Sequence, residues 1–218
     1  MTTSAAPWWS TRSFAVAMMI AAIVPLLWPV IPPLVDLPGH MGRYAVEIAA
    51  PDSPLHRWFH FEWAVIGNLG VDLLVIPLAK LFGLELAVKL IAIAIPALTV
   101  AGRLLVAREA HGEIPPSAAL ALPLAYGYPF QFGFVNFALS MALALLGFAL
   151  WLRLGRTGRL KLRAVLFVMN GFVLLFAHCF GWGVLGLLAF AAGLDRELPQ
   201  PQRAQFLDRG LHVVLVAH

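Results

Sequence analysis

The chain has 218 residues, of which 61% are hydrophobic and 12% are charged, and its mean hydropathy is +0.85. A soluble domain is about half apolar and about a quarter charged, so this composition argues against a soluble globular protein. The formal net charge is +4, but the Lys and Arg residues lie at the ends of apolar runs, as in the cytoplasmic loops of membrane proteins, which argues against a nucleic-acid partner.

Several near-continuous apolar runs approach the length of roughly 20 residues that a helix needs to cross the hydrocarbon core of a bilayer. The sequence therefore predicts an all-α, polytopic transmembrane bundle, with about 6–7 membrane-embedded helices in a single domain over residues 1–218. Its partner is then the lipid bilayer. The one cysteine, Cys179, excludes an intrachain disulfide.

The first span is predicted over residues 13–31. It runs into prolines instead of a signal-peptidase site, which favours a retained helix over a cleaved signal peptide. Pro25 and Pro29 lie in its second half, where they are expected to kink it.

Residues 32–62 are too polar to span and form the first outer loop. Within them, residues 38–49 predict a short amphipathic helix that lies flat on the membrane surface. Its apolar face has helical spacing and consists of Met41, Tyr44, Ala45 and Ile48. The polar face carries His40, Arg43 and Glu47.

Residues 63–108 allow two interpretations. They form either two full spans with a tight turn at residues 81–84, or a broken element over residues 63–82 followed by one span over residues 84–106. Asn68, Asp72 and Pro77 interrupt the first half. Such breaks are tolerated where a helix lines a cavity and not where it faces lipid.

After a short apolar piece that ends at Leu124, a helix is predicted over residues 137–152. A basic loop follows at residues 153–163. Residues 164–194 are apolar but hold "AHCFGWG" near their middle, which predicts two short helices joined there. A polar loop over residues 195–210 precedes a last apolar stretch, residues 211–218, which resembles the start of another span; we expect the sequence to be the N-terminal part of a longer protein.

The positive-inside rule places the basic loop, and with it the N-terminus, in the cytoplasm. The segments "VDLPGH", "GYPFQFGFVN" and "HCFGWG" then all face outward, provided that residues 63–108 cross the bilayer an odd number of times. This parity favours the broken element.

Asp36 precedes the predicted surface helix. It suits an N-cap, with Pro38 in the first turn. It also suits a partly desolvated carboxylate that accepts a proton from a hydroxyl. Arg43 and His40, one turn further on, form either a solvated polar face or a phosphate site. Asp36 and His40 are too few for a metal site, so we predict none; a divalent metal is possible but not required.

The other polar residues are also open to two interpretations. His56 and His60 lie among aromatic residues, as in an interfacial belt or a sugar site. Asn68 and Asp72 suit either contacts between helices or a polar cleft. Gln131 and Asn136 lie at the outer end of two predicted helices. His178 suits a core position, or the cleft if the chain breaks there. The candidate substrate-binding residues are thus His40, Arg43, Glu47, His56, His60, Asp72, Gln131, Asn136 and His178.

The segments "PPLVDLPGHMGRY", "GFVNFALSMALALLGFALWLRL" and "AHCFGWG" resemble parts of the C-type (GT-C) integral-membrane glycosyltransferases, in an uncharacterised bacterial branch. The resemblance implies an enzyme of the bacterial inner membrane that moves a sugar from a polyprenyl-phosphate donor to an acceptor on the extracytoplasmic side, with no cofactor required. Asp36 would be the catalytic base, and Arg43, His40 or His178 would hold the donor phosphate.

Two features depart from that family. No second carboxylate adjoins Asp36, and the large C-terminal region of many members is not in this sequence. Two other functions therefore stay open. The chain is either a transporter or flippase for a lipid-linked or small anionic substrate, or a membrane subunit without enzymatic activity.

Overall fold

The computed structural model describes residues 7–197, and every regular element among them is helical, as the sequence predicts. The predicted apolar stretch at residues 211–218, and the polar loop beyond residue 197, lie outside the described residues. The chain divides into two compact units, Met1–Leu185 and Gly186–His218. The second contains the later part of α9, and the architecture below is that of the first.

The first apolar helix is shorter than predicted. A 3-10 turn, η1 (Trp8–Ser10), precedes α1 (Arg12–Ile23), and a second, η2 (Val24–Leu26), follows it. The prediction over residues 13–31 was wrong at its C-terminal end, because Pro25 has no N–H to continue the ladder and the helix tightens and stops there. The Tyr126 hydroxyl donates a hydrogen bond of 2.5 Å to the Ala22 carbonyl near this end.

A helix also forms where the surface helix was predicted. α2 (Leu37–Glu47) begins one residue early and ends two residues early relative to residues 38–49. Its buried residues are Leu37, Tyr44 and Val46, and it packs on α4. Another 3-10 turn, η3 (Pro54–Arg57), lies in the loop that follows.

The broken-element interpretation of residues 63–108 agrees with the structure. Residues 63–69 are irregular, and α3 (Gly70–Phe82) has 13 residues, or about 20 Å at 1.5 Å per residue. That is too short for a span. α4 (Leu84–His111) has 28 residues and extends past the predicted end at residue 106.

Three short elements, η4 (Pro116–Leu120), α5 (Ala121–Ala125) and α6 (Tyr128–Gln131), lead to α7 (Val135–Arg156). α7 extends into the predicted basic loop, since Arg is a good helix former and ends no helix by itself.

α8 (Leu160–Ala177) and α9 (Cys179–Glu197) are joined at His178, as "AHCFGWG" predicted. They are not short, however, because α8 already begins within the basic segment.

Among the described residues, α4, α7 and α8 are long and apolar enough to cross a membrane. Two shorter apolar helices, Arg12–Leu26 and Cys179–Leu194, accompany them. The structure thus supports an all-helical protein with three candidate spans.

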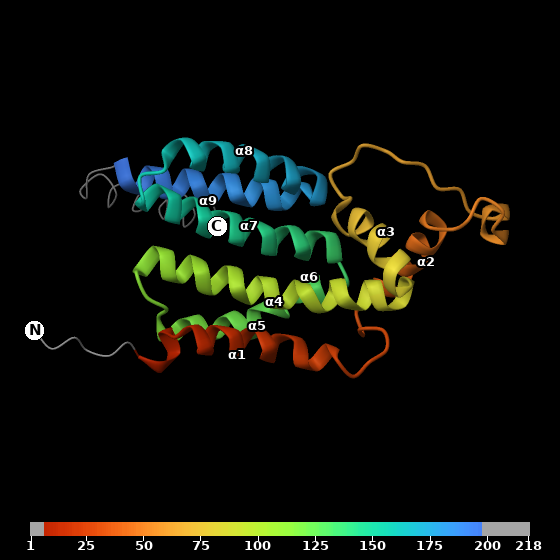
Figure 1. Ribbon diagram of the computed structural model, residues 1–218, viewed down its shortest axis with the longest axis horizontal. Helices are drawn as coiled ribbons and strands as arrows, with labels where there is room; N and C mark the ends of the chain where they lie inside the picture. Colours follow the sequence, from red (N-terminus) through yellow and green to blue (C-terminus); the bar gives the residue numbers. More distant parts are fainter. Residues whose placement is uncertain (1–6, 198–218) are drawn as a thin grey trace, which may run out of the picture. The chain divides into compact units, whose positions relative to one another are not determined.

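α4 is the centre of the first unit. It packs along α7 on one side and along α1 on another, and α8 packs on α7 (Figure 1). A Cβ atom added to Gly102 of α4 would lie 2.7 Å from the Leu145 Cβ of α7, so glycine permits this close approach of the two helices.

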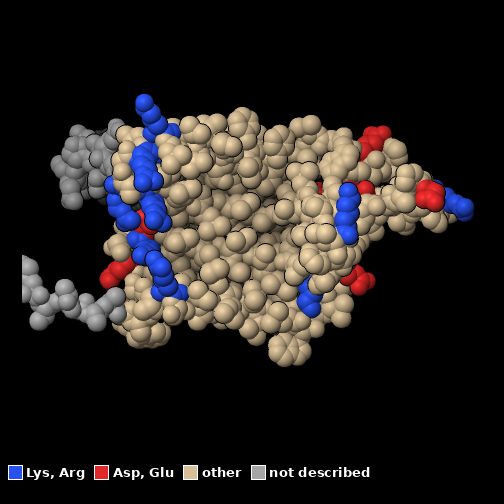
Figure 2. Space-filling model, in the orientation of Figure 1, with Lys and Arg blue, Asp and Glu red and all other residues tan. Residues whose placement is uncertain are grey.

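The first unit has two chemically different ends. The N-terminus of α8 and the C-termini of α4 and α7 lie at one end with the start of α1, where Lys and Arg form a band (Figures 1 and 2). We call this the basic end. The opposite end, here the polar end, comprises α2, α3, the loop of residues 48–69, α6 and the joint at His178 (Figure 1). The outward-facing motifs predicted from the sequence thus share one end of the unit.

Candidate functional site

A pocket of about 420 Å³ opens at the polar end. Most of its wall is aromatic, and its polar side chains come from three separate segments. Its lining residues are His40, Asn68, Pro129, Phe134, Phe137, His178 and Phe180.

Asp36, the predicted base, stands at the start of α2, one turn before His40, and does not itself line this pocket. Its backbone N–H donates to the Phe132 carbonyl at 2.9 Å. A Cβ on Gly133, whose φ is +88°, would come within 2.9 Å of the Asp36 nitrogen, so glycine lets the two segments dock. The Asp36 residue is exposed, and its carboxylate accepts no capping hydrogen bond from the residues that the structure describes. The carboxylate is therefore open to a ligand.

His40 lies one helical turn beyond Asp36, and its N–H donates to the Asp36 carbonyl at 3.1 Å. Its ring stacks on Tyr44, with 6.2 Å between the ring centroids. Burial and the positive charge of Arg43 lower the pKa of His40, and the negative charge of Asp36 partly opposes them. Near pH 7 this imidazole is mainly neutral, with one N–H donor and one acceptor nitrogen.

His178 reaches the same pocket from the joint between α8 and α9. Its backbone is extended, at φ −170° and ψ 129°, and its ring packs edge-on against Phe137 at 5.5 Å. The Nδ1 atom accepts a hydrogen bond of 3.3 Å from the Phe180 N–H. Burial lowers the pKa of His178. The pocket thus presents two mainly neutral imidazoles, from positions 138 residues apart, to whatever binds there.

Next to the pocket, a buried network joins α2, α3 and α7. The Asp72 carboxylate is fully buried and forms an ion pair with Arg43 through Oδ1. Its Oδ2 accepts a hydrogen bond of 3.1 Å from Asn136 Nδ2. Asn136, 4% exposed, also donates to the Asn68 carbonyl at 3.1 Å and accepts from the Val71 N–H at 2.5 Å. Each side chain of this Arg43–Asp72–Asn136 network thus bridges two elements.

This network changes the expected roles of three residues. Asp72 and Asn136 do not line the pocket. Asp72 instead binds Arg43, and Asn136 binds the start of α3. Arg43 does not line the pocket either, and one of its amino groups is bound to Asp72. Its side chain is 37% exposed, which leaves other N–H donors of the guanidinium accessible.

Glu47 lies one turn beyond Arg43, at the end of α2. Both of its carboxylate oxygens are shielded from solvent, and they have no hydrogen-bond partner among the described residues. Burial and the negative charge of Asp72 raise the pKa of Glu47 to about 7, although Arg43 opposes the shift. Glu47 lines a separate pocket with Trp63 and Lys80.

The other predicted residues lie elsewhere. His56 Nε2 is 3.1 Å from the Ala50 carbonyl oxygen, and His60 Nε2 is 3.0 Å from Glu62 Oε1; both histidines are exposed in the loop of residues 48–69. Gln131 donates to the Tyr126 carbonyl. None of these three residues lines the pocket of His40 and His178.

Among the side chains of residues 7–194, His, Cys, Asp and Glu do not gather in a group of three that would hold a metal ion. The lining residues that the sequence did not single out are Pro129, Phe134, Phe137 and Phe180. Their positions in polar–aromatic segments of the sequence could have indicated a site. That they form one wall of the same pocket depends on the packing of α6, α7 and α9. No family model, curated protein or solved structure matches this chain.

Proposed function

We propose that the protein is an integral-membrane glycosyltransferase of the C type, which moves a sugar from a polyprenyl-phosphate donor to an acceptor. In this proposal it belongs to the bacterial cytoplasmic membrane, with 6–7 membrane-embedded helices, a cytoplasmic N-terminus and the polar end outside. The observation that carries the proposal is that His40 and His178 line one aromatic pocket, and that His40 lies one helical turn from the open carboxylate of Asp36.

Asp36 is the proposed base. It accepts the proton of an acceptor hydroxyl, whose oxygen attacks the anomeric carbon of the sugar. The bond from that carbon to the donor phosphate oxygen breaks, and polyprenyl phosphate leaves with the electron pair. His40 and His178 donate neutral N–H hydrogen bonds to the phosphate, and Phe137 and Phe180 pack against the sugar ring.

Arg43 supports this reaction with the donors that Asp72 leaves open. A guanidinium held by a buried carboxylate keeps one orientation, so less entropy is lost when its remaining N–H groups meet a phosphate. Asp72 and Asn136 are then positioning residues.

The test is Asp36→Asn in the full-length protein, assayed for sugar transfer from a polyprenyl-phosphate donor. Loss of a general base lowers the rate by at least about 100-fold. Because this carboxylate caps no described backbone N–H, the unfolding temperature should not change. Asp52→Asn, an exposed carboxylate in the outer loop, is the matched control and should retain activity. Unaltered transfer by Asp36→Asn would refute the role of Asp36.

A specific observation also favours transport as a second candidate. Glu47 has a shielded carboxyl group with a pKa of about 7 beside the Arg43–Asp72 pair, an arrangement suited to proton uptake and release. Substrate flux without a covalent product, in proteoliposomes, would support a transporter over a transferase.

A further inference from the structure

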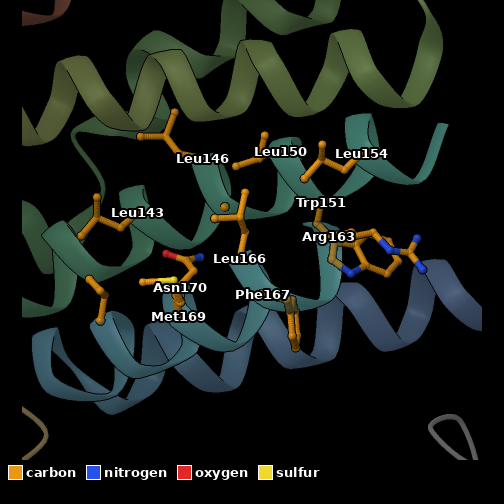
Figure 3. Close-up of a pocket in the computed structure, with 12 residues that line it drawn as sticks. Leu143, Leu146, Leu150, Trp151, Leu154, Arg163, Leu166, Phe167, Met169 and Asn170 are labelled. Atoms are coloured by element: carbon orange, nitrogen blue, oxygen red, sulfur yellow. The ribbon is translucent and has the colours of Figure 1, made fainter. Parts of the chain in front are cut away.

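A second pocket lies between α7 and α8 and extends to the basic end. It has a volume of about 320 Å³ and is lined mainly by leucines and aromatic residues (Figure 3). In Figure 3, Leu143 lies at one end of it, and Trp151 and Arg163 lie at the other. Both helices are candidate membrane spans, and an apolar pocket between two spans is chemically suited to an acyl chain.

The length of this pocket matches one leaflet of a bilayer. Its lining on α7 runs from Leu143 to Leu154, a rise of roughly 16 Å along the helix at about 1.5 Å per residue. That is about half of the ~30 Å hydrocarbon thickness. A neighbouring apolar pocket shares Leu143 and Val173 and continues the groove toward α3.

The mouth of the pocket at the basic end is positively charged. The Arg163 guanidinium lies over the Trp151 ring, 4.5 Å from its centroid. Arg163 forms no ion pair with the part of the chain that the structure describes. Arg153, Arg159 and Lys161 are exposed close by in the sequence, and Glu109 binds Arg156 at 2.6 Å. Among the side chains of residues 7–194, the mouth therefore carries an excess of cations.

Asn170 adds a polar group inside the groove. Its amide lies against Gly147 of α7, where a Cβ atom would overlap it. Asn170 is about 10 Å along the helix from Arg163, seven residues at about 1.5 Å each. The Asn170 N–H donors therefore lie level with the part of a phospholipid that joins the phosphate to the acyl chains.

We infer that the groove between α7 and α8 binds one anionic phospholipid from the leaflet at the basic end. Its phosphate contacts Arg163, and one acyl chain lies along Leu150 and Leu166. Charge complementarity favours an anionic headgroup, because basic pockets between membrane spans bind anionic lipid headgroups. The inference does not depend on the chemistry proposed for Asp36.

The test uses the full-length protein, delipidated in detergent, with phosphatidylglycerol or phosphatidylcholine of identical acyl chains. We expect phosphatidylglycerol to raise the unfolding temperature by roughly 3 °C near saturation. Phosphatidylcholine should produce less than half of that shift. Equal shifts by both lipids would overturn the charge selection, and an equal shift by glycerol phosphate alone would overturn the acyl-chain contact.

Arg163→Gln should weaken phosphatidylglycerol binding, measured by native mass spectrometry, by roughly fivefold. Lys161→Gln removes the same charge from the same helical turn but lies outside the pocket, and should change binding by less than about twofold. Equal weakening by the two variants would indicate diffuse attraction and refute the site. Leu150→Trp narrows the groove at an exposed position. It should abolish the rise in unfolding temperature that phosphatidylglycerol produces, and leave the unfolding temperature without lipid unchanged.

Discussion

Individual acidic residues at the polar end differ in how much the fold compensates their charge. Asp36 is exposed, Asp72 is buried and paired, and Glu47 has shielded oxygens without a partner among the described residues. Because a carboxyl group in the surroundings of Glu47 favours its neutral form, the folded state raises the pKa of Glu47.

Glu47 makes the stability of the protein depend on pH. The folded state binds this proton more tightly than the unfolded chain, with a pKa of about 7 against an ordinary 4.5. The free energy of unfolding should therefore fall as pH rises from about 4.5 to about 7, and level off above that range. Glu47→Gln should remove this fall, measured by unfolding in mixed micelles between pH 4.5 and 8.

Glu85→Gln is the control for this prediction, because Glu85 is exposed at the start of α4. It should keep the wild-type dependence on pH. If the free energy of unfolding fell with pH equally in Glu47→Gln and in the wild type, the shielded carboxyl group would not cause that fall.

At the scale of elements, α2, α3 and α7 are tied by polar contacts as well as by packing. α2 is amphipathic and short, and a helix of 11 residues is marginal by itself in water. The Arg43–Asp72 pair joins it to α3, and Asn136 joins α3 to α7. The position of α2, and with it of Asp36 and His40, thus depends on this network.

Asp72→Asn tests the network at nearly constant volume. The amide keeps a hydrogen-bond acceptor but removes the charge that compensates Arg43, so we expect a loss of about 2 kcal/mol in the free energy of unfolding. Asp52→Asn makes the same change at an exposed site and should cost less than about 0.5 kcal/mol. A loss no larger than that of Asp52→Asn would show that the network contributes little.

At the scale of the whole molecule, the separation of a polar end from a basic end predicts its orientation in a membrane. The positive-inside rule puts the basic end in the cytoplasm. Cys179 is exposed at the joint between α8 and α9, at the polar end, and is the one cysteine in the sequence. It is a natural probe of that end.

In intact spheroplasts, a membrane-impermeant maleimide should label Cys179 from outside. In a Cys179→Ser background, Thr157→Cys, at an exposed position between α7 and α8, should be labelled only after the membrane is permeabilised. Labelling of both positions from the same side would contradict the orientation.

The sequence by itself determined the helical class, the break at His178 and the sharing of one end by the polar motifs. These follow from hydropathy and from segments such as "AHCFGWG" that interrupt an apolar run, which are local properties of the chain. Helix lengths were less predictable: Arg and Lys at the ends of α7 and α8 continue the helices, so the end of an apolar run does not mark the end of a helix.

Tertiary structure alone decided which polar residues meet. Arg43, which the sequence left open as a solvated residue or a phosphate contact, is bound to Asp72, 29 residues away, and Asp72 in turn meets Asn136, 64 residues further on. No local pattern encodes such pairs, because they depend on how α2, α3 and α7 pack. The same packing brings His40 and His178 to one pocket.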